Sequence, residues 1–143
     1  MTVQANYNET MPPLCLGAIS DTNEKTLISR NAEEVITFGK PVVQGAGDKG
    51  CRLAAAGDTA ILGVSVMERS AINDQWEMYE SVRIMTEGTI AVEALVAVAA
   101  GDPVHVDLAA AAFTNAGGVP LNHARFEDSA AAGELVRIRI AVA

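Results

Sequence analysis

Hydrophobic and polar residues alternate most regularly through Ser81–Glu93, which reads SVRIMTEGTIAVE. A period of two is typical of a β-strand with one buried face, and a glycine near the middle is typical of a turn. We therefore predict a hairpin whose three-residue loop ends at Gly88, where a left-handed residue is needed. This register pairs Ile84 with Ile90 and turns Met85 to the other face. A slip of one residue would expose an apolar face to water.

Shorter apolar stretches, separated by glycine, proline and aspartate, occupy the rest of the chain. Segment 61–67 is uncharged on both faces, which predicts a strand covered on both sides, whereas the polar segment 23–31 predicts a loop. No stretch has the length and period of an ordinary helix. The other predicted strands are residues 17–22, 35–38, 41–44, 51–54, 104–107, 122–127 and 134–142. This pattern favours an all-β fold, either a jelly-roll-like sandwich or a barrel.

The first sixteen residues differ from the rest because they are polar and show no strand or helix period. Pro12 and Pro13 favour an extended backbone there, so we expect an extended N-terminal arm over residues 1–16. Disorder of residues 1–8 is the alternative. The remaining residues, 17–143, have the length of a single β domain.

Two short strings recur along the chain. Residues 39–43 (GKPVV) return as residues 101–105 (GDPVH), 62 positions later. Residues 80–84 (ESVRI) return as residues 134–138 (ELVRI), 54 positions later. The strings indicate two similar halves of one barrel, or else a chance match between short strings that are common in β proteins.

The charge balance narrows the classes of partner. Among 143 residues, 18 are Asp or Glu and 10 are Lys or Arg, which gives a net charge of −8. Nucleic acids and anionic membranes attract basic surfaces, so neither is an expected partner. The longest apolar run, 94–100, is too short to span a bilayer, and no signal peptide is visible. We expect Cys15 and Cys51 to be reduced, as in a cytoplasm, with a bridge between them as the alternative.

Candidate chemistry is sparse. Residues 45–50 (GAGDKG) match the GxGxxG pattern, but residues 57–58 interrupt the chain before the helix that a dinucleotide site requires. His105 and Asp107 share a strand face and His123 lies apart, which is not the spacing of a metal site. The adjacent carboxylates of Glu33 and Glu34 have no apolar pocket to raise a pKa. We therefore expect no enzyme activity, no metal and no cofactor.

Several residues are candidate partner contacts. Trp76, Met78 and Tyr79 lie in the acidic loop 68–80, where they suit a protein interface or the covering of an open barrel end. On the last strand, Arg137 and Arg139 face outward, either as a solvated face or as a contact. The arm could order along a partner. Its candidate contact residues are Tyr7, Met11, Pro12, Pro13 and Leu14.

Segments along most of the chain resemble the capsid cement, or decoration, proteins of tailed bacteriophages, a family called structural cement protein. They occur in the family's order. The matching pieces are residues 17–22 (GAISDT), 29–30 (SR), 38–43 (FGKPVV), 62–64 (LGV), 99–104 (AAGDPV), 113–115 (FTN), 124–126 (ARF) and 130–138 (AAAGELVRI).

The resemblance implies a jelly-roll-like protein on the outer surface of an icosahedral head, assembled in the host cytoplasm. It implies binding to the major capsid protein at contacts between capsomers, as a homodimer or homotrimer. It supplies no catalytic residues. Two other classes stay open: a receptor- or carbohydrate-binding β module, and a small trimeric β-barrel nucleotide hydrolase. Three assays would separate these classes: binding to purified shells for a cement protein, binding to glycans for a carbohydrate-binding module, and turnover of a nucleotide for a hydrolase.

Overall fold

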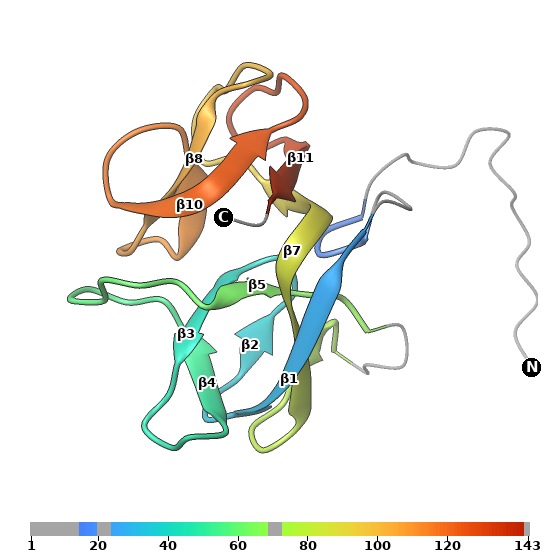
Figure 1. Cartoon of the computed structure of the whole chain (residues 1–143), viewed down its shortest axis with the longest axis vertical. Helices are drawn as coiled ribbons and strands as arrows, with labels where there is room; N and C mark the ends of the chain where they lie inside the picture. The colour runs from blue at the N-terminus through green and yellow to red at the C-terminus, as the bar shows by residue number, and fades with distance from the viewer. Residues whose placement is uncertain (1–14, 20–23, 69–72, 142–143) are drawn as a thin grey trace, which may run out of the picture.

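The computed structural model describes residues 15–19, 24–68 and 73–141, and within them it contains eleven strands and no helix. The predicted all-β class is confirmed (Figure 1). Residues 1–14 of the predicted arm, which include its five candidate contact residues, lie outside the described residues. The strands are β1 (Thr26–Ala32), β2 (Ile36–Thr37), β3 (Pro41–Gln44), β4 (Gly50–Leu53), β5 (Gly63–Ser65), β6 (Gln75–Trp76), β7 (Ser81–Glu93), β8 (Pro103–Asp107), β9 (Ala112–Thr114), β10 (Val119–Phe126) and β11 (Leu135–Ile140).

The predicted hairpin at residues 81–93 is wrong, because β7 is one continuous strand of thirteen residues. Residues 81–87 pair with β1, and residues 88–93 pair with β11. Ile84 therefore lies opposite Ile28, and Ile90 lies opposite Ile138. Gly88 does have a positive φ, +129°, but it marks the point where the strand passes from one partner to the other.

The first half of β7 closes a five-stranded barrel. The order β1-β4-β3-β5-β7 returns to β1 through the antiparallel pairing of β1 with β7. One pairing in this ring is parallel, that of β1 with β4, in which Asn31 lies opposite Gly50 and Ala32 lies opposite Cys51. We call this unit the first barrel; it occupies the lower part of Figure 1.

The second half of β7 closes another five-stranded barrel, which we call the second barrel. Its order is β7-β11-β10-β8-β9, and a parallel bridge between Ala94, just after β7, and Phe113 of β9 completes the ring. The Leu95 N–H donates to the Phe113 carbonyl at 2.8 Å. The two barrels lie one above the other and share β7 (Figure 1).

The two barrels have the same topology, strand for strand. In each, one parallel contact joins the first and third strands of the unit in chain order, and every other pairing is antiparallel. The register of the pairings repeats with the same sequence offsets. In the first barrel Ile84 pairs with Ile28, and in the second barrel the residue 54 positions after Ile84, Ile138, pairs with the residue 62 positions after Ile28, Ile90. The recurring strings thus mark equivalent strands, in two barrels and not in two halves of one.

Short connections repeat as well. The Tyr79 N–H donates to the Ala32 carbonyl at 2.7 Å, and the Gly133 N–H donates to the Ala94 carbonyl at 2.7 Å. Tyr79 and Gly133 both have positive φ, at 70° and 84°. This agreement in hydrogen bonds and dihedrals, at the offsets of 54 and 62, goes beyond what a chance match of short strings would produce.

The buried residues form two cores, and β7 contributes to both: the smaller core lies within the first barrel, and the larger one combines residues of β3 and β5 with residues of the second barrel. Val82 and Ile84 lie in the smaller core of the first barrel, together with Phe38 and Trp76. Met85 points the other way, but it is fully buried in the larger core with residues of the second half of β7 and of β8–β11. Both faces of β7 are therefore covered, which the hairpin prediction did not foresee.

Two further predictions need correction. The predicted loop 23–31 contains all but the last residue of strand β1 (Thr26–Ala32); several side chains of its sequence TLISRNA are exposed, which accounts for the polar pattern. The predicted loop 68–80 contains the short strand β6, which pairs with β2. Around residue 64, strand β5 is shorter than expected, but all of its residues are buried, as predicted for a strand covered on both sides.

Candidate functional site

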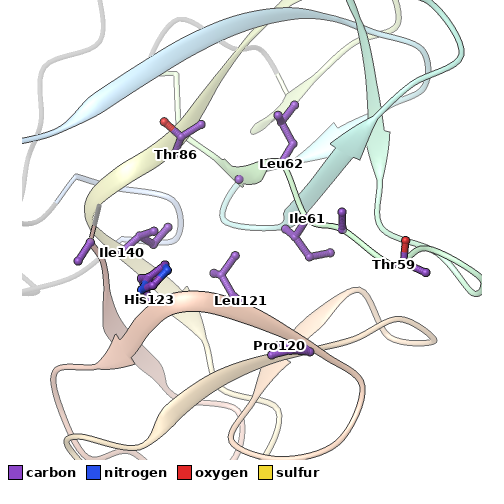
Figure 2. A pocket seen from close by; sticks show the side chains of 11 residues that line it. Thr59, Ile61, Leu62, Thr86, Pro120, Leu121, His123 and Ile140 are labelled. Carbon is purple, nitrogen blue, oxygen red and sulfur yellow. The ribbon is translucent and has the colours of Figure 1, made fainter. Parts of the chain in front are cut away.

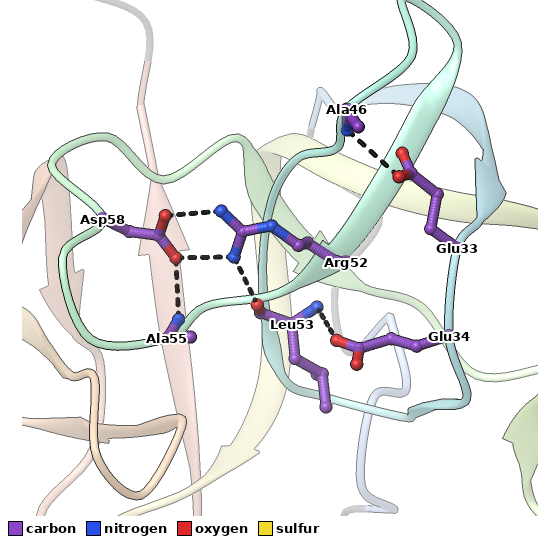
Figure 3. Close-up of polar contacts among 7 residues, drawn as sticks. All are labelled: Glu33, Glu34, Ala46, Arg52, Leu53, Ala55 and Asp58. Atoms are coloured by element: carbon purple, nitrogen blue, oxygen red, sulfur yellow. Dashed lines mark hydrogen bonds and ion pairs between the residues drawn. The ribbon is translucent and has the colours of Figure 1, made fainter.

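The glycine-rich segment 45–50 holds a carboxylate of the chain itself. The Ala46 N–H donates to Oε1 of Glu33 at 3.0 Å (Figure 3). A side-chain carbon at Gly45 or Gly50 would collide with the Glu33 carboxylate. The glycines of the GxGxxG pattern thus let the turn close around Glu33, and the pattern is accounted for without a phosphate.

Glu34 and Arg52 also serve the first barrel. Glu34 accepts a hydrogen bond from the Leu53 N–H at 2.9 Å, and Arg52 makes a bidentate ion pair with Asp58, at 2.7 and 2.9 Å (Figure 3). The hydrogen bond from Arg52, followed by that from the Ala55 N–H, holds the pKa of Asp58 below its usual value. These acidic residues are occupied in tying the strand ends and turns together.

The two histidines do not form a metal site with the acidic residues. His105 lies on β8, and Asp107 accepts hydrogen bonds from the N–H groups of Ala109 and Ala110 in the turn that follows. Within the described part of the chain, no three His, Cys, Asp or Glu side chains come together as metal ligands would. No described helix is long and apolar enough to cross a membrane.

A groove lies between the two barrels. Ile61, from the segment before β5, and Leu121 and His123, from β10, point into it from opposite sides (Figure 2). His123 is the one titratable side chain among the described residues that line this groove.

The structure separates the three candidate contacts of the loop 68–80. Trp76 is only 6% exposed; its ring packs edge-on against Phe38, with ring centres 6.1 Å apart, and its Nε1–H donates to the Val66 carbonyl at 3.0 Å. These contacts place Trp76 in the smaller core, where little of its ring is left for a partner. Met78 and Tyr79 are 49% and 81% exposed, so these two remain available to a partner.

The two candidate arginines of β11 also differ. Arg137 is held by Asp128 through two hydrogen bonds of 2.7 and 2.8 Å, which hold the pKa of that carboxyl below its usual value. Arg139 is exposed and lies directly opposite Arg125 of β10. The outward direction predicted for both is correct, but only Arg139 presents its guanidinium without an ion pair among the described residues.

The exposed large apolar side chains gather at equivalent places on the two barrels. Val35, Met78 and Tyr79 lie where β1 ends and β7 begins, and we call this surface the first end. Leu95, Val96 and Leu135 lie where β7 ends and β11 begins, and we call this surface the second end. Because β7 runs from one to the other, the two ends lie at opposite extremes of that strand.

Sequence reasoning missed most of these residues. It selected Met78 and Tyr79 but none of the three residues of the second end. The recurring strings contained the signal, because residues 95 and 96 follow the first strand of the second barrel as residues 33 and 34 follow that of the first. Once the first end was selected, the recurring strings could have directed the search for a second contact surface to positions 54 or 62 residues later in the sequence.

The two cysteines are both unpaired and have different surroundings: Cys15 is exposed and Cys51 is buried. Burial, with the nearby Glu33 carboxylate, raises the pKa of the Cys51 thiol to about 11. A solution at pH 8 lies about three pH units below this pKa, so only about one Cys51 thiol in a thousand is ionised there.

We therefore predict that a coloured disulfide reagent at pH 8 titrates one thiol per chain quickly, and the second only after denaturation. Absorbance during the titration measures both phases. Two fast thiols would contradict the burial of Cys51. No thiol in denaturant, without reductant, would instead show a bridge between Cys15 and Cys51.

Residues 3–141 match the protein family described as "Structural cement protein (E217 gp24/Pam3 gp6)". This is a family of phage structural proteins and not an enzyme family. No curated protein matches the chain.

Solved structures with a similar fold include two from bacteriophages. A chain of "The capsid of Myoviridae Phage XM1" superposes with a TM-score of 0.80 at 15% identity, over 99% of this chain and 98% of that one. A chain of "The crystal structure of head fiber gp8.5 N base in bacteriophage phi29" gives a TM-score of 0.56 at 13% identity, over 82% of this chain and 95% of that one. At these identities the likeness is one of fold.

Proposed function

The chain belongs to the structural cement protein family of phages, and from this premise we propose that it binds the outside of the major capsid protein shell at contacts between capsomers. Membership makes it a structural component of the virion, as the resemblance of its segments implied. The finer statement, which surface it binds and between which subunits, is the proposal.

One observation carries the proposal beyond the family: the first end and the second end each expose large apolar side chains, and they lie at opposite extremes of β7. Thirteen residues of strand measure at most about 43 Å. A rigid body with a contact surface at each extreme can touch two neighbouring shell subunits at once. Two linked weak contacts hold far more tightly than either alone.

Self-association and the arm belong to the same proposal. A homodimer or homotrimer would multiply the number of linked contacts with the shell. The arm, with Tyr7 and Met11 through Leu14 as its candidate contacts, adds a segment that could lie along a shell subunit. The net charge of −8 suits a protein that works beside packaged DNA without being drawn to it.

Binding to purified heads that lack this protein tests the proposal. The full chain is expected to saturate such heads, and the variants Met78→Ser with Tyr79→Ser, and Leu95→Ser with Val96→Ser, are each expected to lose at least about tenfold in affinity, because a buried contact side chain is commonly worth about 1–2 kcal/mol. Bound copies per head, measured by gel densitometry, give the affinity. A chain lacking residues 1–16 is measured beside them and is expected to be retained less well.

The control is Ala55→Ser with Ala56→Ser, which makes the same apolar-to-polar change in the exposed turn between β4 and β5. It should bind as the full chain does. If the full chain does not bind heads, the proposed function is wrong. If both end variants bind as tightly as the control, the shell is held through other surfaces and the bridging arrangement is wrong.

A further inference from the structure

Two arginines face each other across β10 and β11. Arg125 is the register partner of Arg139, and both side chains are exposed. Their neighbours in register, Ala124 with Ile140 and Phe126 with Ile138, are buried, so the two guanidinium groups share the outer face of the sheet. Like charges directly opposite each other in an antiparallel pair are unfavourable.

Within the described part of the chain, neither arginine makes an ion pair. The ion pairs there join Arg52 to Asp58, Arg83 to Glu68 and Arg137 to Asp128. On the same strand, two residues before Arg139, Arg137 is paired with an acidic side chain, whereas Arg139 is not. The uncompensated pair stands out on a chain that carries eight more acidic than basic side chains.

The backbone beside the pair is irregular. Between Pro120 and Arg125, strand β10 advances five residues while β8 advances two, so β10 bulges there. His123 lies in this bulge with a φ of +60°, and the Ala141 N–H donates to its carbonyl at 2.9 Å. A positive φ is uncommon outside glycine, and bulges often re-aim a side chain at a binding site.

The arginines and the histidine line one surface depression. Its lining is His123, Arg125, Glu127, Arg139 and Ala141. Two guanidinium groups and an imidazole therefore face a single carboxylate. An arginine guanidinium presents several N–H donors in a flat fork that matches a carboxylate in two-point contact, so the depression is suited to carboxylates supplied from outside.

We propose that this depression receives an acidic segment of the shell protein, with Arg125 and Arg139 each binding a carboxylate. The inference rests on the proposed function and adds a recognition chemistry to it. The shell contact then combines apolar ends with a charged site that sets orientation. An uncompensated pair is retained because the partner, and not the chain, provides its counter-charges. A polyanion such as nucleic acid fits less well, since the rest of the molecule repels it.

The test is the double variant Arg125→Gln with Arg139→Gln, measured for binding to purified heads over a range of salt concentrations. We expect at least a tenfold loss of affinity at 0.15 M salt and a weaker dependence on salt than that of the full chain. The same variant should unfold at an unchanged or slightly higher temperature, because it loses a like-charge pair. A purely structural role would instead lower the unfolding temperature.

The matched control is Lys25→Gln with Lys49→Gln, which removes the same two charges from exposed positions of the first barrel. It should keep the binding and salt dependence of the full chain. Equal loss in the control, an unchanged double variant, or a change in oligomeric state with head binding intact would each overturn the inference while leaving the proposed function in place. Failure of the full chain to bind heads would overturn both.

Discussion

Ile84→Asp is expected to leave the chain largely unfolded at 25 °C. The Ile84 side chain is fully buried in the smaller core, beside Val82 and Trp76. The change removes roughly 1.5–3 kcal/mol of apolar burial and leaves a carboxyl with no partner in the core, at several kcal/mol more. Whole domains are stable by only about 5–15 kcal/mol, so the substitution consumes most or all of that stability.

The single tryptophan reports on this directly, because Trp76 belongs to the same core. Urea unfolding followed by its fluorescence should give a sharp transition for the unaltered chain and none, or one near zero urea, for Ile84→Asp. Ser81→Asp is the control: it adds a carboxylate to the same strand at an exposed position and should change stability by no more than about 0.5 kcal/mol. A native-like transition in Ile84→Asp would contradict the burial of this side chain.

Gly88→Ala is expected to destabilise the chain by about 2–6 kcal/mol. The φ of +129° is open to glycine and strained for any other residue, which costs about 1–3 kcal/mol. A side-chain carbon there would lie 2.9 Å from Cβ of Lys25 and 3.1 Å from the sulfur of Met85, and such overpacking adds about 1–3 kcal/mol. The urea midpoint should fall while the slope of the transition stays the same.

Gly47→Ala provides the comparison. Nothing lies within 4 Å of a side-chain carbon at Gly47, and its φ is not positive. Alanine there should be neutral or should stabilise by about 0.4–1 kcal/mol, because it restricts the unfolded chain. If Gly88→Ala proved as benign as Gly47→Ala, the passage of β7 between the barrels would not depend on glycine.

Strands that are determined by the alternation of neighbouring residues could be predicted from the sequence. Pro41–Gln44 was predicted with its observed bounds, and β8 and β11 were predicted to within two residues at each end. In each, alternating side chains lie between glycine-containing turns, so neighbours in the sequence decide the outcome. The alternation that turns Arg137 and Arg139 outward also requires Val136, Ile138 and Ile140 to point inward, and all three are buried.

The wrong predictions concern places where segments that are distant in the sequence determine how a strand pairs. A glycine with positive φ can end a hairpin loop, and it can equally lie within one continuous strand that changes its pairing partner. Only the pairing of β1 and β11 with the two halves of β7 distinguishes the two cases. β1 could not be recognised because its polar side chains hide its strand character. The opposition of Arg125 and Arg139 needed the register of β10 with β11, which no local pattern specifies.

Sharing β7 also has a mechanical consequence. A load that pulls the first end away from the second is carried along one polypeptide backbone, with the ladders to β1 and β11 stressed in shear along their length. Two barrels joined by a flexible tether would stretch under the same load before any ladder resisted. The shared strand therefore keeps the first end and the second end at a fixed spacing, which is what the shell contact that we propose requires of both ends at once.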